Sequence, residues 1–159
     1  MKKNIERVGR FVIETEASAL LKLASDLPKD FLGTIESILN TKGRVVVSGV
    51  GKSGHVGRKI AATLASTGTP ASFVHATEAS HGDLGMITPE DFCLLISNSG
   101  ETAELNDILA HTRRFGIVTA VISSSMNSTL MQAADLKLVL TDAPEACTIG
   151  MAPTTSTIL

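Results

Sequence analysis

The 159-residue chain has no Tyr, no Trp and only five Phe. It is therefore nearly without the aromatic side chains on which single-stranded nucleic acids stack, and we expect no nucleic-acid partner. Its two cysteines, Cys93 and Cys147, form neither a CxxC pair nor a disulfide framework, which favours free thiols in a reducing cytoplasm. No apolar run approaches the roughly 18 residues of a membrane span. The N-terminus has no apolar stretch typical of a signal peptide, so we expect a cytoplasmic protein with no membrane partner.

Positive charge is missing from the middle of the chain. Residues 1–59 carry 11 Lys and Arg against 6 Asp and Glu, residues 60–159 carry 3 against 10, and no Lys or Arg lies between Ile60 and Thr112. An anionic ligand held by the middle stretch would need hydroxyls, backbone N–H groups or histidines. An uneven helix surface would give the same distribution, so charge alone does not decide between the two.

Helical and strand patterns alternate along the chain. Apolar residues at helical spacing predict helices over residues 6–27, 29–40, 54–67, 101–115 and 127–134. Short apolar runs predict strands at 45–47, 71–74, 92–96, 117–122 and 136–140. Continuous apolar strands are typical of a parallel sheet that is buried on both faces. We therefore predict an α/β fold: a three-layer αβα sandwich around a five-stranded parallel sheet of flavodoxin-like order, preceded by N-terminal helices.

The length suits one domain over residues 1–159, with the N-terminal helices in 1–43 and the α/β core in 44–159. Pro153 begins a helical pattern that ends after barely two turns, which predicts a truncated C-terminal helix. The apolar faces of the first two helices and a mean hydropathy of +0.24 favour oligomerisation. Packing of those helices on the sheet is the alternative.

A glycine-rich loop follows the first predicted strand. Residues 49–54 match the pattern G-x-G-x-x-G and open a helix, where free backbone N–H groups and the helix dipole attract phosphate. A P-loop is excluded because Val46 stands where it needs a glycine. A dinucleotide site would need an acid after the second strand, where His75 stands. Phosphate binding, dinucleotide binding and a simple tight turn are the three interpretations.

A serine-rich loop follows the third predicted strand. Ser97, Ser99 and Thr102 place three hydroxyls around Gly100 at the start of a helix, which predicts a neutral cradle for a phosphate group. Helix capping is the alternative interpretation, with Asn98 as N-cap and Glu101 three residues later in the manner of a capping box. Both interpretations are compatible with each other.

Residues 75–83, which follow the second predicted strand, contain two histidines and two acids. His75 and His81 lack the spacing of an HExxH site, so a zinc ligand, a proton carrier and a loop histidine without chemistry all remain open. Glu104 and Glu145 are further carboxylates that either serve this edge of the sheet or are merely solvated.

Together these motifs resemble a known family. Residues 51–55, 65–70, 79–86, 96–101, 145–147 and 152–154 follow one another as in the sugar isomerase (SIS) domain of the bacterial arabinose 5-phosphate isomerases, and the resemblance covers residues 5–159. It implies interconversion of D-ribulose 5-phosphate and D-arabinose 5-phosphate for Kdo, lipopolysaccharide or capsule biosynthesis. It also implies a homotetramer that needs no cofactor. An isomerase of another sugar phosphate and a non-catalytic sugar-phosphate-binding module are the alternatives.

The resemblance also implies roles for particular residues. The catalytic residues would be Lys52, His81, Glu104 and Glu145, and the substrate-binding residues would be Ser48, Ser53, Gly68, Thr69, His81, Ser97, Ser99 and Thr102. His75 would be the histidine that can bind an inhibitory zinc. The family's downstream His-Pro-Gly segment and CBS modules have no counterpart here, which puts the activity of this chain in question.

The reaction requires a base that moves a proton between two carbons and an electrophile that stabilises the enediolate. Glu104 and Glu145 are both candidates for the base. Lys52 would be the electrophile, and His81 would handle hydroxyl protons or ring opening.

Overall fold

The structure is a computed structural model that describes residues 2–150 and 153–159. The chain divides into two compact units. The larger comprises Pro28–Val139, and the smaller comprises residues 1–27 together with residues 140–159. Each unit is described by itself below.

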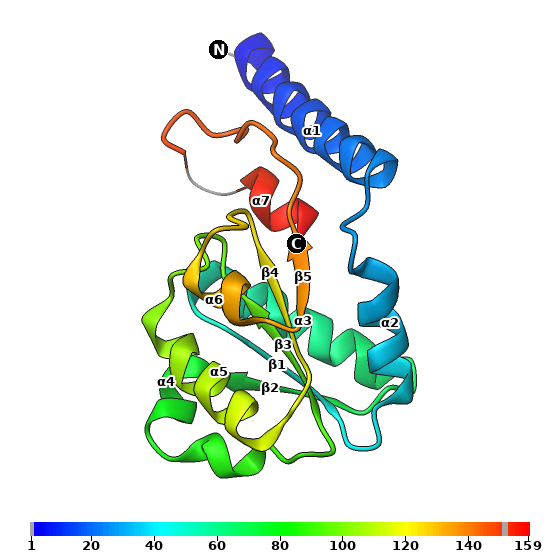
Figure 1. The fold of residues 1–159 in the computed structure, drawn as a ribbon. Coiled ribbons are helices and arrows are strands. Elements are labelled where there is room, and N and C mark those ends of the chain that lie inside the picture. Colours follow the sequence, from blue (N-terminus) through cyan, green and yellow to red (C-terminus); the bar gives the residue numbers. More distant parts are fainter. Residues whose placement is uncertain (1, 151–152) are drawn as a thin grey trace. The chain divides into compact units, whose positions relative to one another are not determined.

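A parallel sheet of five strands forms the centre of the larger unit (Figure 1). The strands are β1 (Val45–Gly49), β2 (Ala71–His75), β3 (Phe92–Ile96), β4 (Thr119–Ser123) and β5 (Leu136–Val139). Their spatial order is β2-β1-β3-β4-β5, and all four neighbouring pairs are parallel. The predicted flavodoxin-like parallel sheet is therefore confirmed.

Helices cover both faces of this sheet (Figure 1). One face is covered by α2 (Phe31–Asn40) and α3 (Gly51–Ser66), and the other by α4 (Ala76–Ser80), the 3₁₀ turn η1 (Asp83–Met86), α5 (Ala103–Phe115) and α6 (Thr129–Ala133). The second face forms a continuous apolar core in which Val46, Leu95 and Val121 meet helical residues such as Leu105 and Ile108. The three-layer arrangement agrees with the prediction.

Burial of the strands follows their place in the sheet. Strands β1, β3 and β4 are buried along their whole length, whereas β2 and β5 are mostly half-buried. The two half-buried strands form the edges of the sheet. On α5, the predicted apolar residues Leu105, Ile108, Leu109 and Thr112 are all buried, and Gly116 ends the helix in the left-handed conformation at φ 66°.

Helix α3 packs on the sheet through small residues. The apolar pattern Val56, Ile60 and Leu64 predicted its buried face, yet these side chains are only half-buried. Its buried residues are instead Gly54, Gly57 and Ala61. A Cβ atom at Gly57 would lie 3.1 Å from the Phe73 ring and 3.2 Å from Val47. The small side chains therefore let the α3 backbone lie close against β1 and β2.

The smaller unit contains α1 (Lys2–Ser25) and α7 (Pro153–Ile158), which pack against each other. Lys22 donates a 2.5 Å hydrogen bond to the carbonyl of Asp142. Pro153 is the first residue of α7, as the sequence predicted. Most large apolar side chains of α1 are exposed, among them Ile5, Ile13 and Leu21. None of the helices that the structure describes is long and apolar enough to cross a membrane.

The central strand predicts a large effect of truncation in the core. Leu95 is fully buried in β3, so Leu95→Ala should lower the free energy of unfolding by about 2–5 kcal/mol through lost burial and an unfilled cavity. The matched control is Met86→Ala, because Met86 is 43% exposed at the end of η1. Urea denaturation followed by circular dichroism measures both. Equal midpoints for the two variants would contradict the packing described here.

Candidate active site

The crossover connections change face between β1 and β3. The chain leaves β1 through α3 on one face and leaves β3 through α5 on the other, although the two strands are hydrogen-bonded neighbours. Parallel α/β sheets bind ligands at such a switch point, at the carboxyl ends of the strands, because the first turns of both helices border the same crevice. Lys52 and the serine-rich loop both lie at this edge.

The glycine-rich loop brings the start of α3 against the end of β1. Gly51 has a φ of 58°, and a Cβ atom at Gly54 would lie 2.8 Å from the carbonyl oxygen of Gly49. Both glycines are therefore required by the backbone itself. The backbone N–H groups of Gly51, Lys52 and Ser53 donate to no atom of the described residues. The first turn of α3 thus presents three free donors at the switch point.

The serine-rich loop is organised by its own hydroxyls. The Ser97 hydroxyl lies 2.7 Å from that of Thr102 and accepts a 3.0 Å hydrogen bond from the N–H of Gly100. Ser99 accepts a 3.2 Å bond from the N–H of Glu101. Within the described chain, the N–H groups of Thr102, Ala103 and Glu104 have no acceptor. These three N–H groups form a second set of free donors. We call residues 97–104 the cradle.

The capping interpretation of this loop is wrong. Helix α5 begins at Ala103, its N-cap is Thr102, and no side chain caps it. Glu101 instead accepts a 2.8 Å hydrogen bond from the N–H of Thr129 in the next loop, and Asn98 bonds to Ser124. Hydrogen bonds from the Thr129 hydroxyl and N–H lower the pKa of the Glu101 carboxyl below its ordinary value of 4.5.

The segment predicted as a loop over 75–83 is largely helical. His75 is the N-cap of α4, and its Nδ1 accepts a 3.3 Å hydrogen bond from the N–H of Thr77. His81 ends the helix and is exposed. The Ser80 hydroxyl lies 3.4 Å from the carbonyl oxygen of Glu104. This contact joins the His81 end of α4 to the start of α5, so His81 and the cradle occupy one region.

The predicted zinc ligand has no companions in the part of the chain that the structure describes. That part contains no group of three His, Cys, Asp or Glu side chains able to hold a metal ion. An inhibitory zinc at His75 would therefore need ligands from elsewhere. Cys93 is not a candidate nucleophile either, because burial, with a smaller contribution from Asp91, raises the pKa of its thiol to about 12.

Three exposed ionisable side chains are free to act at this edge. Lys52 in the first turn of α3, His81 at the end of α4 and Glu104 in the first turn of α5 are all exposed. None of these three side chains has a hydrogen-bond or ion-pair partner among the described residues. They are therefore available to a ligand, in contrast to Glu101 and His75.

Glu145 lies in the smaller unit and is already engaged there. Its carboxylate accepts hydrogen bonds from the N–H groups of Thr154 (2.9 Å) and Thr155 (3.1 Å) and from the Thr155 hydroxyl. In return, the N–H of Ala146 donates a 3.0 Å bond to the Thr154 hydroxyl. Glu145 therefore caps the N-terminus of α7, where a carboxylate offsets the positive end of the helix.

Three predicted substrate-binding residues are not exposed at the carboxyl edge of the sheet. Ser48 is fully buried in β1, and its hydroxyl has no partner among the described residues. Gly68 and Thr69 follow the end of α3 and precede β2. They lie at the amino edge of the sheet because α3 runs antiparallel to the strands. The structure does bring together Ser97, Ser99 and Thr102 in one loop, and Ser53 follows the neighbouring strand at the same edge of the sheet.

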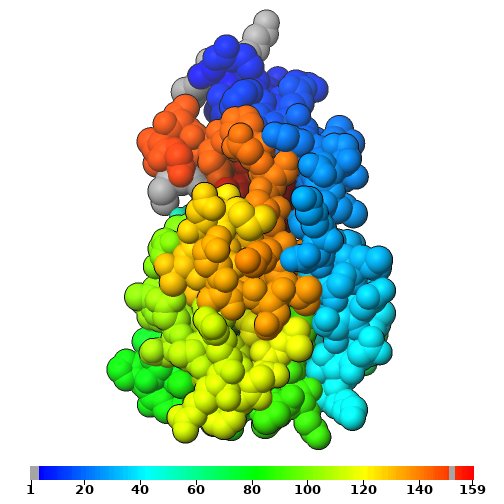
Figure 2. Space-filling model, in the orientation of Figure 1, coloured from blue at the N-terminus to red at the C-terminus, as the bar shows by residue number. Residues whose placement is uncertain are grey.

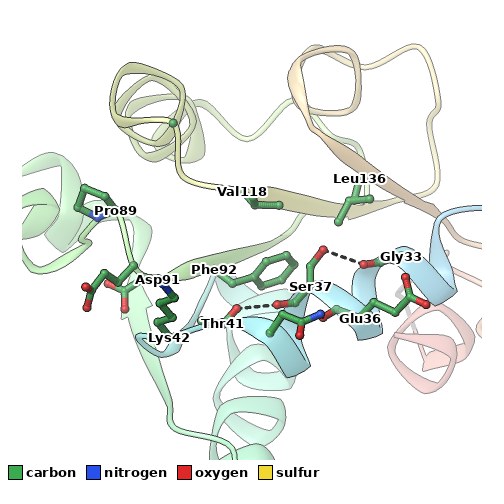
Figure 3. Close-up of a pocket in the computed structure, with 13 residues that line it drawn as sticks. Gly33, Glu36, Ser37, Thr41, Lys42, Pro89, Asp91, Phe92, Val118 and Leu136 are labelled. Carbon is green, nitrogen blue, oxygen red and sulfur yellow. Dashed lines mark hydrogen bonds between the residues drawn. The ribbon is translucent and has the colours of Figure 1, made fainter.

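A hollow of about 750 Å³ lies at the opposite, amino edge of the sheet (Figure 3). Phe92, Val118 and Leu136 form its base beside α2. Its polar groups are largely satisfied internally: Ser37 donates to the carbonyl of Gly33 and Thr41 to that of Ser37 (Figure 3). The Asp91 carboxylate accepts from the N–H groups of Arg44 and Thr88. The free donors at the carboxyl edge therefore make the better candidate site.

Sequence reasoning missed the loop between β4 and α6. Ser123 and Ser124 donate hydrogen bonds to Asn98, and Ser128 packs against Gly100, although none of the three was predicted to matter. Their position in the sequence predicts this placement, because this serine-rich run also follows a strand and must reach the same edge of the sheet.

Comparison with known proteins identifies the family. Residues 38–159 match the SIS domain family. The chain is 49% identical over 154 residues to arabinose 5-phosphate isomerase KdsD of Yersinia pestis, a match that covers 97% of this chain and 47% of that protein. It is 47% identical over 159 residues to KdsD of Pseudomonas aeruginosa, covering 99% and 49%. The chain thus spans about half the length of these curated relatives.

Solved structures agree with the sequence relatives. The protein c3406 of E. coli CFT073, solved in complex with arabinose 5-phosphate, superposes with a TM-score of 0.93 at 38% identity and covers 99% of this chain and 85% of its own. A putative phosphosugar isomerase involved in capsule formation from Bacteroides fragilis superposes with a TM-score of 0.84 at 40% identity, covering 97% and 82%. The chain belongs to the SIS domain family.

Proposed function

We propose that this chain is the isomerase domain of an arabinose 5-phosphate isomerase, which interconverts D-arabinose 5-phosphate and D-ribulose 5-phosphate. The observation that carries the proposal is the pair of free helix starts at the switch point, which offers backbone N–H groups and hydroxyls to a phosphoryl group. The names of the KdsD relatives and the arabinose 5-phosphate complex of the E. coli protein support this substrate.

The cradle suits a sugar phosphate because it binds the phosphoryl group without cationic side chains. Backbone N–H groups at the start of α5 and the hydroxyls of Ser97, Ser99 and Thr102 would hold it, with Ser53 at the start of α3. Lys52 then remains free for the reacting carbons. Binding at the phosphate also fixes the orientation of the sugar, so remote binding energy serves the chemical step.

The reaction moves one proton between carbons without a redox cofactor. In the aldose, a base removes the proton from C2, and the electrons shift to the C1 carbonyl to give an enediolate. The base then returns a proton to C1, while the O2 proton is transferred to O1, which yields the ketose. The Lys52 ammonium would stabilise the enediolate oxygen, and His81 would move the hydroxyl proton.

We assign the base to Glu104 because its carboxylate is free. Glu104 is exposed beside the cradle, and its side chain has no partner among the described residues, whereas Glu145 uses both carboxylate oxygens to cap α7. Because both Glu145 oxygens already accept hydrogen bonds from α7, they are less accessible to a substrate than those of Glu104. Glu145 would therefore act as a positioning residue that holds the start of α7.

We also propose a homotetramer in the cytoplasm that supplies arabinose 5-phosphate for Kdo synthesis. Support for oligomerisation comes from the apolar side chains that α1 and α2 expose, including Ile13, Leu21, Leu32 and Leu39. Helix α2 forms part of the surface in the space-filling view (Figure 2). Gly68 and Thr69, at the amino edge, would then reach a substrate only in a neighbouring copy.

Removal of the Lys52 ammonium should slow turnover more than it weakens binding. In the full-length protein, Lys52→Met should lower kcat by about 10²–10³-fold, since the enediolate loses its electrophile, while the Kd for arabinose 5-phosphate changes little. A coupled isomerase assay and calorimetry measure the two quantities. Lys59→Met is the control, because Lys59 is exposed on the same helix and bonds only to Thr63. Normal turnover by Lys52→Met would remove Lys52 from the mechanism.

Isotope exchange should separate the two glutamates. Glu104→Gln should lower the rate of deuterium incorporation at C2 from D₂O by about 10²–10⁴-fold, the usual contribution of a general base. Glu145→Gln should lower the melting temperature and change the exchange rate less than tenfold, because a neutral amide still accepts one helix N–H. The opposite ranking would make Glu145 the base. Binding without exchange in the wild-type protein would instead indicate a non-catalytic sugar-phosphate-binding module.

A further inference from the structure

The loop that follows β4 lies directly against the cradle. Residues 123–129, which we call the brace, connect β4 to α6, and β4 is hydrogen-bonded to β3, from which the cradle emerges. Ser124, Ser125 and Met126 are exposed, and the surrounding segment, yellow to orange, is at the surface in Figure 2. The brace is therefore not core structure, although two of its serines, Ser123 and Ser128, are buried against the cradle.

The brace binds the carbonyl groups of the cradle. The N–H of Ser124 and the hydroxyl of Ser123 each donate a 3.0 Å hydrogen bond to the carbonyl of Asn98. The N–H of Leu130, directly after the brace, donates a 3.1 Å bond to the carbonyl of Gly100. Because these carbonyls face the brace, they do not face a ligand. The free N–H groups of residues 102–104, which attract phosphate, are then not offset by these two carbonyls.

Gly100 allows this close approach. Its φ is 69°, and a Cβ atom at this position would lie 1.9 Å from the Ser128 hydroxyl oxygen and 2.9 Å from that of Ser123. Any side chain at position 100 would therefore push the cradle away from the brace. The glycine serves the contact between two loops as well as the turn itself.

Glu101 joins the two loops through its side chain. Its carboxylate accepts the 2.8 Å bond from the N–H of Thr129 at the start of α6. A carboxylate next to a phosphate site would repel the ligand if it faced the crevice. Bonding to Thr129 holds this charge on the brace, and the lowered pKa of Glu101 shows that the bond favours the ionised form.

We propose that the brace is a positioning element for the phosphoryl group, and that Glu101 is the positioning residue that fastens the cradle to it. The proposal rests on the proposed function, since it assumes that the cradle binds a phosphate. It assigns to Glu101 a role that acts through the cradle and not through contact with the substrate.

Two substitutions of Glu101 separate tethering from charge. In the full-length protein, Glu101→Ala loses the acceptor, and Glu101→Gln keeps an amide oxygen that can accept from Thr129 while it removes the charge. We expect Glu101→Ala to raise the Kd for arabinose 5-phosphate and for inorganic phosphate about tenfold, the usual effect of losing one charge-assisted hydrogen bond. KM should rise in parallel and kcat should change less than threefold. For Glu101→Gln, the Kd for each ligand should stay within threefold of the wild-type value.

Calorimetry with the two ligands and steady-state kinetics provide the readouts. Glu36→Ala is the control, since Glu36 is an exposed glutamate on α2, away from the cradle. If Glu101→Ala does not fold, Ser123→Ala tests the same contact and should raise both Kd values about threefold through loss of a neutral hydrogen bond.

The outcomes distinguish this proposal from the one it rests on. A wild-type protein that binds neither arabinose 5-phosphate nor phosphate would overturn the proposed function. A wild type that binds both, with Glu101→Ala and Ser123→Ala equal to it, would overturn only the brace. If Glu101→Ala and Glu101→Gln raise the Kd values equally, the proposed role of the Glu101–Thr129 hydrogen bond would also be wrong. If Glu101→Ala or Ser123→Ala lowers the melting temperature but leaves both Kd values unchanged, the brace stabilises the fold and does not position the phosphoryl group.

Discussion

The candidate site depends on one constraint, the requirement that backbone polar groups find partners. At the start of a helix the first N–H groups have none within the helix. Because the crossovers leave β1 and β3 on opposite faces, two such helix starts lie at the same edge of the sheet. The carbonyls of Asn98 and Gly100, which would repel an anion, are bonded to the following segment instead. The polarity of this edge thus arises from the topology of the sheet before any charged side chain contributes.

Side chains of the same type serve different purposes in this chain. Glu101 and Glu145 each accept hydrogen bonds at the start of a helix, and His75 does so through its ring nitrogen. Glu104 and His81 belong to the same residue types and are exposed without partners in the described chain. Residue type alone therefore does not distinguish a side chain that holds the fold together from one that is free for chemistry. The hydrogen-bond inventory makes that distinction.

Much of the fold followed from local patterns. Continuous apolar runs located all five strands, and the spacing of Leu105, Ile108 and Leu109 identified the buried face of α5. The pattern failed on α3, because close packing against a sheet selects small residues that carry little hydrophobic periodicity. It failed again at Glu101, whose hydrogen-bond partner Thr129 comes from a distant part of the chain. Long-range partners of polar side chains are set by topology, and a single sequence does not display them.

The seating of α3 has a consequence for how this protein can change. Gly54 and Gly57 leave no room for a methyl group between the helix and the strands beneath it. A larger residue at either position would lift the helix and displace its first turn, which carries Lys52. The packing at these two positions therefore helps to set where the first turn of α3 places Lys52. The volume of the side chain therefore limits which substitutions Gly54 and Gly57 tolerate. An alanine at either position would inactivate the protein while leaving it folded.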